Sequence, residues 1–264
     1  MRIGRYRIDA LIDGEGHQPA TEVFPGTTAQ QWQGHHSLLD EEGRLTIAVG
    51  AFLVRSVDRT LLIDLGYGPG ALGKIRTGRM LGSLRALEVD PSEITDIVFT
   101  HLHRDHVGWA SVDGVPQFPN AIFRCRPADY AYFVTAGRGD PSILERLRPC
   151  LDRFESFDEG ALFPEVTIRD APGHTPGSCV VLFSSGTERA VVLGDVAHSP
   201  VQLLEREWNT LYDLDPVLAR RTRQRLLHEL EGDSFPMVAG MHFPGLRFGR
   251  LLEFEGRRQW MVRG

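Results

Sequence analysis

The sequence Thr100-His101-Leu102-His103-Arg104-Asp105-His106-Val107-Gly108-Trp109 follows an apolar segment, residues 94–99, that predicts a buried strand. Four of its side chains are potential metal ligands: His101, His103, Asp105 and His106. Alternate residues of an extended segment point to the same side, so the first two histidines can hold one metal ion. Asp105 and His106, where the chain turns into a helix, can then reach a second ion nearby.

Three further potential ligands also follow strand-like segments: His174, Asp195 and His242. Strand ends give side chains a rigid support, and the adjoining loops leave them freedom of aim, which suits a metal site. We expect His174 to join the first pair of ligands and His242 the second. The two carboxylate oxygens of Asp195 can bridge both ions. Five imidazoles and two carboxylates are a donor set for two zinc ions, with iron or manganese as alternatives.

The rest of the chain predicts alternating strands and helices. Strands are expected at 3–12, 45–56, 60–65, 121–125, 166–169, 179–183, 190–193, 236–239, 246–254 and 257–262. Helices are expected at 81–87, from 107–110 onward, twice within 127–151, and at 216–231, whose arginines should form a solvated face. Residues 14–46 predict mainly loop, with Phe24 and Trp32 packing on the domain or forming a lid. No linker or repeat divides the chain, so 1–264 is expected to be a single domain.

Composition narrows the class of protein. The chain has 264 residues, a net charge of −6 and a pI of about 5.9, so it lacks the basic footprint of a nucleic-acid-binding protein. No apolar run reaches the roughly 18–20 residues that span a bilayer, so we expect no membrane partner. The cysteines are odd in number and form no C-x-x-C pair: Cys125, Cys150 and Cys179. Reduced thiols and a cytoplasmic location are expected, and a homodimer is compatible with general trends.

The motifs together resemble the metallo-β-lactamase superfamily of αββα metallohydrolases. The likeness extends in the family's order over residues 61–242: Leu62-Ile63-Asp64-Leu65-Gly66, the ligand run at 100–106, Gly173-His174-Thr175-Pro176-Gly177, Gly194-Asp195 and His242. It implies an α/β fold, a four-layer αββα sandwich. It assigns His101, His103 and His174 to one metal and Asp105, His106 and His242 to the other, with Asp195 between them. Asp64 would steady the ligand loop, and histidines 17, 35, 36 and 228 would take no part.

The resemblance also implies a reaction, in which a hydroxide that bridges the metals attacks the substrate. Asp105 would accept the proton of this nucleophile and pass it to the leaving group. The family's true β-lactamases have cysteine or serine where this chain has Asp195, so we do not expect β-lactam hydrolysis. Residues 194–202, Trp208 and the ending His242-Phe243-Pro244 look more like the lactonase and methyl parathion hydrolase-like branch. In its lactonases a tyrosine contacts the substrate carbonyl at the position of His198. His198 is therefore a candidate for stabilising the oxyanion or protonating the leaving group.

We therefore expect a di-zinc hydrolase of a small carboxylic ester, with a lactone as the leading candidate. A phosphotriester, phosphodiester or thioester could be cleaved on the same di-metal site. An alternative of another class is a mononuclear iron persulfide dioxygenase, which would need only His101, His103 and Asp195. A binding module without catalysis is disfavoured by the complete set of ligands.

Overall fold

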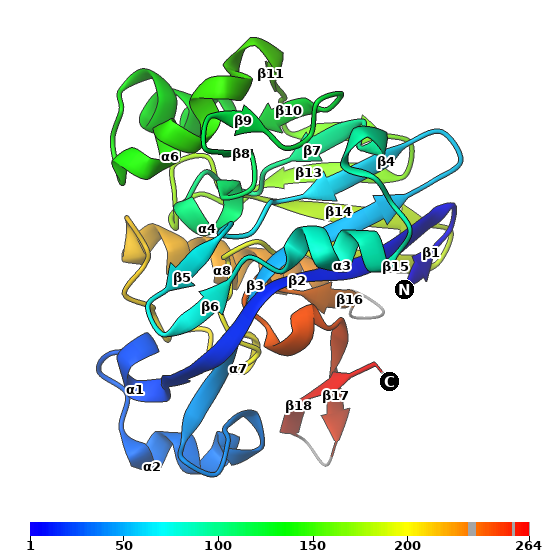
Figure 1. Cartoon of the computed structure of the whole chain (residues 1–264). Helices are drawn as coiled ribbons and strands as arrows, with labels where there is room; N and C mark the ends of the chain where they lie inside the picture. Colours follow the sequence, from blue (N-terminus) through cyan, green and yellow to red (C-terminus); the bar gives the residue numbers. More distant parts are fainter. Residues whose placement is uncertain (232–235, 255–256, 264) are drawn as a thin grey trace.

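The computed structural model describes residues 1–231, 236–254 and 257–263, and its two large sheets pack face to face between outer helices (Figure 1). The first sheet has the order β1 (Arg2–Ile3), β2 (Tyr6–Pro19), β3 (Arg44–Arg55), β4 (Thr60–Ile63), β7 (Asp96–Val98), β10 (Ile122–Cys125) and β11 (Phe154–Ser156). The second has the order β12 (Gly160–Phe163), β13 (Val166–Asp170), β14 (Cys179–Ser185), β15 (Glu188–Val192), β16 (Met237–Ala239), β17 (Gly249–Phe254) and β18 (Arg257–Val262).

The remaining elements are short hairpins and helices. The hairpins are β5 (Gly70–Leu72) with β6 (Ile75–Thr77), and β8 (Ser111–Val112) with β9 (Val115–Pro116). The helices are α1 (Ala20–Val23), α2 (Ala29–Trp32), α3 (Met80–Ala86), α4 (Arg104–Val107), α5 (Pro127–Asp129), α6 (Pro141–Leu147), α7 (Val201–Leu204) and α8 (Pro216–Leu230), with 3-10 turns at 33–38, 91–93, 148–153 and 244–246 and a π-helical turn at 130–135. Among the residues described, none of the helices combines the length and the hydropathy needed to span a bilayer.

Three hydrophobic clusters lie between these layers. One fills the space between the two sheets and includes Phe52 and Phe183. A second joins the first sheet to the helices that cover it, and a third joins the second sheet to α8 through residues such as Leu227. Each sheet is therefore buried on both faces, which accounts for the continuous apolar runs of its central strands. The predicted αββα sandwich is confirmed.

The strands bring the predicted ligands to one end of the sandwich. β7 pairs in parallel with β4 and β10, and β15 pairs in parallel with β16. The backbone N–H of Cys179, at the start of β14, donates to the Thr100 carbonyl and links the two sheets beside the ligand run. Loops that are far apart in the sequence consequently meet at the C-terminal ends of these parallel strands.

The predicted loop at 14–46 is partly wrong. β2 continues to Pro19 and β3 begins at Arg44, because these two strands pair in antiparallel register along their whole length. Polar residues of this part of β2 face solvent, so its sequence lacks the apolar run that predicts a buried strand. The hairpin of β3 and β4 is confirmed. Phe24 and Trp32 are buried and pack against Trp208, so the connection between β2 and β3 folds back onto the domain.

Two helix predictions also need correction. A helix was expected to open at 107–110, but α4 spans Arg104–Val107 and stops at Gly108. The Gly108 N–H donates to the Gly66 carbonyl, and a Cβ on Gly108 would lie 1.9 Å from the Tyr67 carbonyl carbon. This close approach of two backbones ends the helix and requires glycine. In α8 the arginines do not all form a solvated face, because Arg223 is buried.

Candidate metal centre

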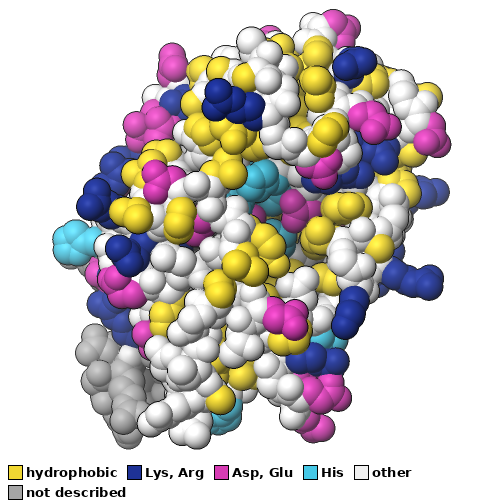
Figure 2. Space-filling view, turned by 90° about the vertical axis from the view of Figure 1, so that its left-hand side faces the viewer, with side chains coloured by type: hydrophobic (Ala, Val, Ile, Leu, Met, Phe, Trp, Pro, Cys, Tyr) yellow, Lys and Arg dark blue, Asp and Glu magenta, His cyan; other side chains and the backbone are white. Residues whose placement is uncertain are grey.

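A hollow on one face of the molecule exposes histidine and carboxylate side chains at its base, with hydrophobic side chains around it (Figure 2). The cavity has a volume of about 510 Å³. Its base is formed by His103, Asp105, His174, Asp195, His198 and His242. Its walls are formed by Gln18, Val23, Ile47, Leu72, Gly73, Arg104, Tyr132, Phe133, Gly139, Asp140, Ile143, Tyr212 and Leu214. A predominantly apolar cavity with a cluster of polar groups at its base is typical of a small-molecule site.

The seven predicted ligands converge at this base in the sets expected from the sequence. The ligand atoms of His101, His103 and His174 lie within 4.8 Å of one another. Those of a second set, Asp105, His106 and His242, do so as well. The geometry fits two metal positions, and the assignment of each residue to a metal stays a prediction.

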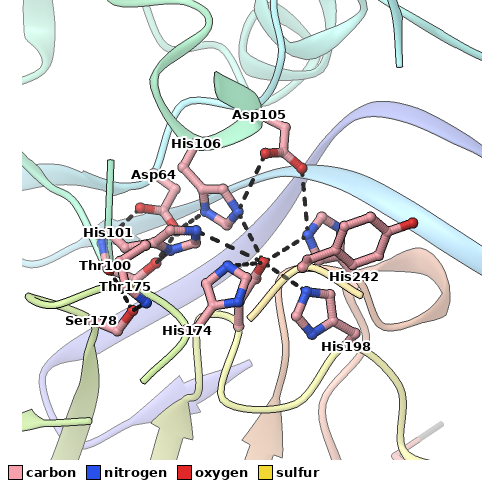
Figure 3. A network of polar contacts seen from close by, with 12 residues as sticks. Asp64, Thr100, His101, Asp105, His106, His174, Thr175, Ser178, His198 and His242 are labelled. Atoms are coloured by element: carbon pink, nitrogen blue, oxygen red, sulfur yellow. Dashed lines mark hydrogen bonds and ion pairs between the residues drawn. The ribbon is translucent and has the colours of Figure 1, made fainter. Parts of the chain in front are cut away.

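Labelled members of both sets, among them His101, His174, His106 and His242, gather around a common centre in Figure 3. Asp195 lies between the two sets. Its Oδ2 atom is 3.8 Å from His101 Nε2 and 3.3 Å from His174 Nε2, on the first set. The same atom is 3.5 Å from His106 Nε2 and 3.1 Å from His242 Nε2, on the second. No other carboxylate among the described residues contacts both sets in this way. Its position fits the predicted bridge.

Unpartnered buried atoms support a metal at both positions. His101 Nε2, His106 Nε2, His174 Nε2 and Asp195 Oδ1 are buried and make no hydrogen bond within the part of the chain that the structure describes. Buried polar atoms without a partner are costly, so four of them among the two ligand sets indicate a bound group. Imidazole nitrogens with carboxylate oxygens are donors that zinc accepts. The residues present therefore fit the metal ions that the sequence implies.

The electrostatic field of the centre differs between the two sets. Burial and the neighbouring imidazole of His174 lower the pKa of His103 to about 3, so this ring is neutral and can bind a metal through nitrogen. Burial also lowers the pKa of His106, but the carboxylates of Asp195 and Asp64 outweigh it and raise that pKa well above its usual value. The carboxylates around His106 thus favour positive charge at the second set.

Asp64 supports the ligand run as the resemblance implies. It is fully buried and adopts the left-handed conformation, with φ of 59°. This uncommon backbone directs its carboxylate to the Thr100 N–H and hydroxyl, at 2.8 and 2.7 Å, and to His106 Nδ1, at 2.8 Å. The contact with Nδ1 leaves Nε2 of His106 to face the metal position, which is how outer carboxylates orient histidine ligands.

Two other ligand histidines have outer partners that the sequence did not indicate. His174 Nδ1 lies 3.0 Å from Asp213 Oδ1, and His242 Nδ1 lies 2.9 Å from the carbonyl oxygen of Ala48. Asp213 is 39 residues from His174 and belongs to no motif, so only the fold could reveal the pair. Both contacts direct Nε2 of the ligand toward the centre.

Asp129 joins the two loops that carry the first set of ligands, and sequence reasoning missed it too. Its Oδ2 accepts from the Leu102 N–H at 2.9 Å and the Thr175 hydroxyl at 3.0 Å. Its Oδ1 accepts from the Gly177 N–H at 2.6 Å. Leu102 lies between two ligands and Thr175 follows His174, so this buried carboxylate ties the loops together. Its sequence context, Arg126-Pro127-Ala128-Asp129, suggested only a helix start.

His198 stands beside the predicted bridge, at the cavity surface. Its Nε2 is 3.2 Å from Asp195 Oδ2, and its ring stacks between those of Tyr212 and His242, with centroid distances of 5.4 and 5.3 Å. Tyr212 was not predicted. Among the described residues, the ligand clusters contain none of the histidines that we set aside: 17, 35, 36 and 228.

Proteins similar to this chain in sequence are named as metallo-hydrolases, metallo-beta-lactamase domain proteins or lactonases. Metallo-beta-lactamase domain-containing protein 1 of Homo sapiens is 27% identical over 230 residues, covering 84% of this chain and 76% of that protein. A probable metallo-hydrolase of Methanocaldococcus jannaschii is 28% identical over 45% of this chain. The N-acyl homoserine lactonase AiiB of Agrobacterium fabrum is 26% identical over 50% of it. The matched part spans only 44% and 56% of the last two proteins.

Solved structures share the fold over the whole chain. The hydrolase AbOPH, of the beta lactamase superfamily, has a TM-score of 0.85 and 26% identity and covers 100% of this chain and 96% of its own. AidC, a dizinc quorum-quenching lactonase, has the same TM-score and coverage with 22% identity, a likeness of fold. The family model of the metallo-beta-lactamase superfamily matches residues 47–242. This protein therefore belongs to the metallo-beta-lactamase superfamily.

Proposed function

We propose that this protein is a di-zinc hydrolase of small uncharged carboxylic esters, and that its substrates are lactones. The observation that carries the proposal is the position of Asp195, whose Oδ2 lies within 4 Å of histidine nitrogens from both ligand sets. A single metal ion would need one set only. Two sets joined by a carboxylate suit a pair of ions that act together.

The metals, when bound, would lower the proton affinity of a water molecule and polarise the ester carbonyl. The chain's own residues do the rest. Asp105 lines the cavity and remains partly accessible, with its oxygens 3.5 Å from His242 Nε2 and 3.9 Å from His106 Nε2. It can accept the proton of the attacking water and return it to the leaving alkoxide. In a lactone this alkoxide stays attached to the product.

His198 is placed to contact the substrate near the reacting carbonyl. Its ring lies at the cavity surface, 3.2 Å from Asp195 and stacked on Tyr212. An imidazole N–H at this point can donate to the oxygen that gains negative charge in the transition state. The lactonase relatives named above support a lactone as the ester.

The charges of the cavity favour an uncharged substrate over a phosphodiester. Arg104 is the only arginine or lysine among the described residues that line it. Its Nη1 donates to the Tyr67 carbonyl, and its guanidinium lies over the Tyr67 ring, 4.3 Å from the centroid. The same wall carries the Asp140 carboxylate. An anionic substrate would find the arginine engaged and a carboxylate nearby.

The test combines metal content with a substrate panel on the purified protein. The panel contains a series of γ-lactones, a paraoxon-type phosphotriester and bis(p-nitrophenyl) phosphate. We expect two zinc ions per chain and the highest kcat/KM on lactones. Asp105→Asn and His103→Ala should each lower kcat/KM by about 10²–10⁴-fold, whereas His228→Ala, at an exposed position, should not change it. Full turnover without bound metal would refute the proposal, and one iron per chain would favour the dioxygenase.

A further inference from the structure

The backbone of His198 is held by a buried glutamine. The His198 N–H donates to Gln202 Oε1 at 2.7 Å, and Gln202 Nε2 donates to the Trp208 carbonyl at 3.0 Å. Gln202 has no exposed surface and lies in α7, the short helix after His198. Its amide thus connects the segment that carries His198 to the segment at Trp208, six residues after Gln202.

A buried arginine holds both of these segments. Arg223, on α8, is 1% exposed. Its Nη1 donates to the Val196 carbonyl at 3.2 Å, its Nη2 to the Trp208 carbonyl at 2.6 Å, and its Nε to the Arg206 carbonyl at 3.2 Å. None of the ion pairs found among the described residues includes Arg223. Burial lowers its pKa to about 10, so it remains a cation near neutral pH.

A buried charge without a bound carboxylate is an expensive way to stabilise a fold, since apolar residues of similar size often do so better. Its hydrogen bonds here go to backbone carbonyls on both sides of His198. A guanidinium, with five N–H groups in a rigid fork, can hold several carbonyls at fixed relative positions, as no apolar side chain can. This specific arrangement indicates a role in placing the loop between 196 and 208.

We propose that Gln202, braced by Arg223 through the shared Trp208 carbonyl, is the positioning residue for His198. The proposal rests on the function proposed above, in which His198 contacts the substrate. Ring stacking on Tyr212 and His242 restrains the plane of the imidazole but leaves it free to slide. The hydrogen bond that the His198 N–H donates to Gln202 fixes the backbone from which the ring extends, and so fixes the distance of the ring from Asp195.

The experiment is a double-mutant cycle between Gln202 and His198 in the zinc-loaded protein. Gln202→Leu should lower kcat on a lactone by about tenfold, the loss that one broken hydrogen bond can cause, with KM nearly unchanged. In a His198→Phe background the same substitution should change kcat less than twofold, because the residue through which Gln202 acts is gone. Gln30→Leu, at an exposed position of α2, is the matched control and should leave kcat unchanged. An equal loss in both backgrounds would refute the proposal, since it would show a general structural effect.

Arg223→Met extends the test, with Arg221→Met on the exposed side of the same helix as its control. It should reproduce the loss seen with Gln202→Leu, and if it does not fold, the glutamine cycle decides alone. A crystal structure of Gln202→Leu gives a readout that needs no activity. It should show His198 Nε2 displaced from its 3.2 Å contact with Asp195 Oδ2. An undisplaced ring would overturn the inference whether or not lactones are cleaved. A displaced ring in a protein that cleaves no lactone would preserve the positioning and refute only the proposed function.

Discussion

Replacing Asp129 with asparagine should weaken metal binding at the set formed by His101, His103 and His174. The fully buried carboxylate accepts three hydrogen bonds from the two loops that carry these ligands. Asparagine has the same shape but only one acceptor oxygen. Its NH2 group would face the Leu102 N–H and the Thr175 hydroxyl in one orientation, and the Gly177 N–H in the other. At least one hydrogen bond that now joins the loops is lost.

The size of the effect follows from these contacts. A hydrogen bond to a charged group contributes about 1.5–3 kcal/mol. Burial disfavours the charged carboxylate and raises the pKa of Asp129. The neutral amide of asparagine avoids this cost of burying a charge, which offsets part of the lost hydrogen-bond energy. We expect the free energy of unfolding to fall by about 2 kcal/mol, which lowers Tm by about 4–8 °C in a chain of this size. Misplaced outer contacts typically reduce metal affinity by about 10–100-fold, and we expect such a loss at the first set.

The assay is a zinc titration of metal-free protein against a competing chelator, with thermal melting in parallel. Asp140→Asn is the matched control, because this exposed carboxylate caps α6 with a hydrogen bond to the Ser142 N–H that asparagine can also accept. The control should bind zinc as tightly as the wild type. If Asp129→Asn lowers Tm but leaves both zinc affinities within twofold of the wild type, then Asp129 serves folding and the reasoning is wrong.

Three further predictions follow from other contacts. Gly108→Ala should lower the free energy of unfolding by several kcal/mol, because a Cβ there would meet the Tyr67 backbone at 1.9 Å. Gly82→Ala on α3 is the control: its Cβ would enter open space, so its Tm should rise slightly. Equal melting temperatures for the two variants would contradict the close approach at Gly108. Asp213→Asn should lower zinc affinity by about tenfold through His174, in a chelator titration, and unchanged affinity would show that Asp213 does not orient that ligand. Burial raises the pKa of the Cys150 thiol to about 11, so between pH 9 and 11 the folded chain keeps this thiol protonated while the unfolded chain ionises it. This thiol should lower the free energy of unfolding by about 1.4 kcal/mol per pH unit in that range, in addition to the losses from Cys125 and Cys179, whose pKa values burial also raises. Urea unfolding of Cys150→Ala should therefore show a pH dependence that is weaker by this amount.

Much of the metal centre could be predicted from the sequence because its signal is local. His101, His103, Asp105 and His106 lie within six residues, and the period of a strand followed by a helix already separates them into two pairs. The strands that support them appear as apolar runs because parallel strands are buried on both faces. His174, Asp195 and His242 could be predicted because each follows such an apolar run, and the structure brings them together with the first four in the expected sets. That residues 1–264 form a single domain, and that the metals are zinc, stay predictions.

The residues that hold the ligands in place could be found only in the tertiary structure. Asp129 reaches Gly177 across 48 positions, and Arg223 reaches Val196 across 27, so neither contact leaves a periodic signal. The arginine looked like part of a solvated face because helical spacing alone does not say which loops will cover it. A side chain that bonds to backbone has no chemically distinctive partner in the sequence. The sequence by itself determined which atoms can bind metal, and packing between distant segments decided what orients them.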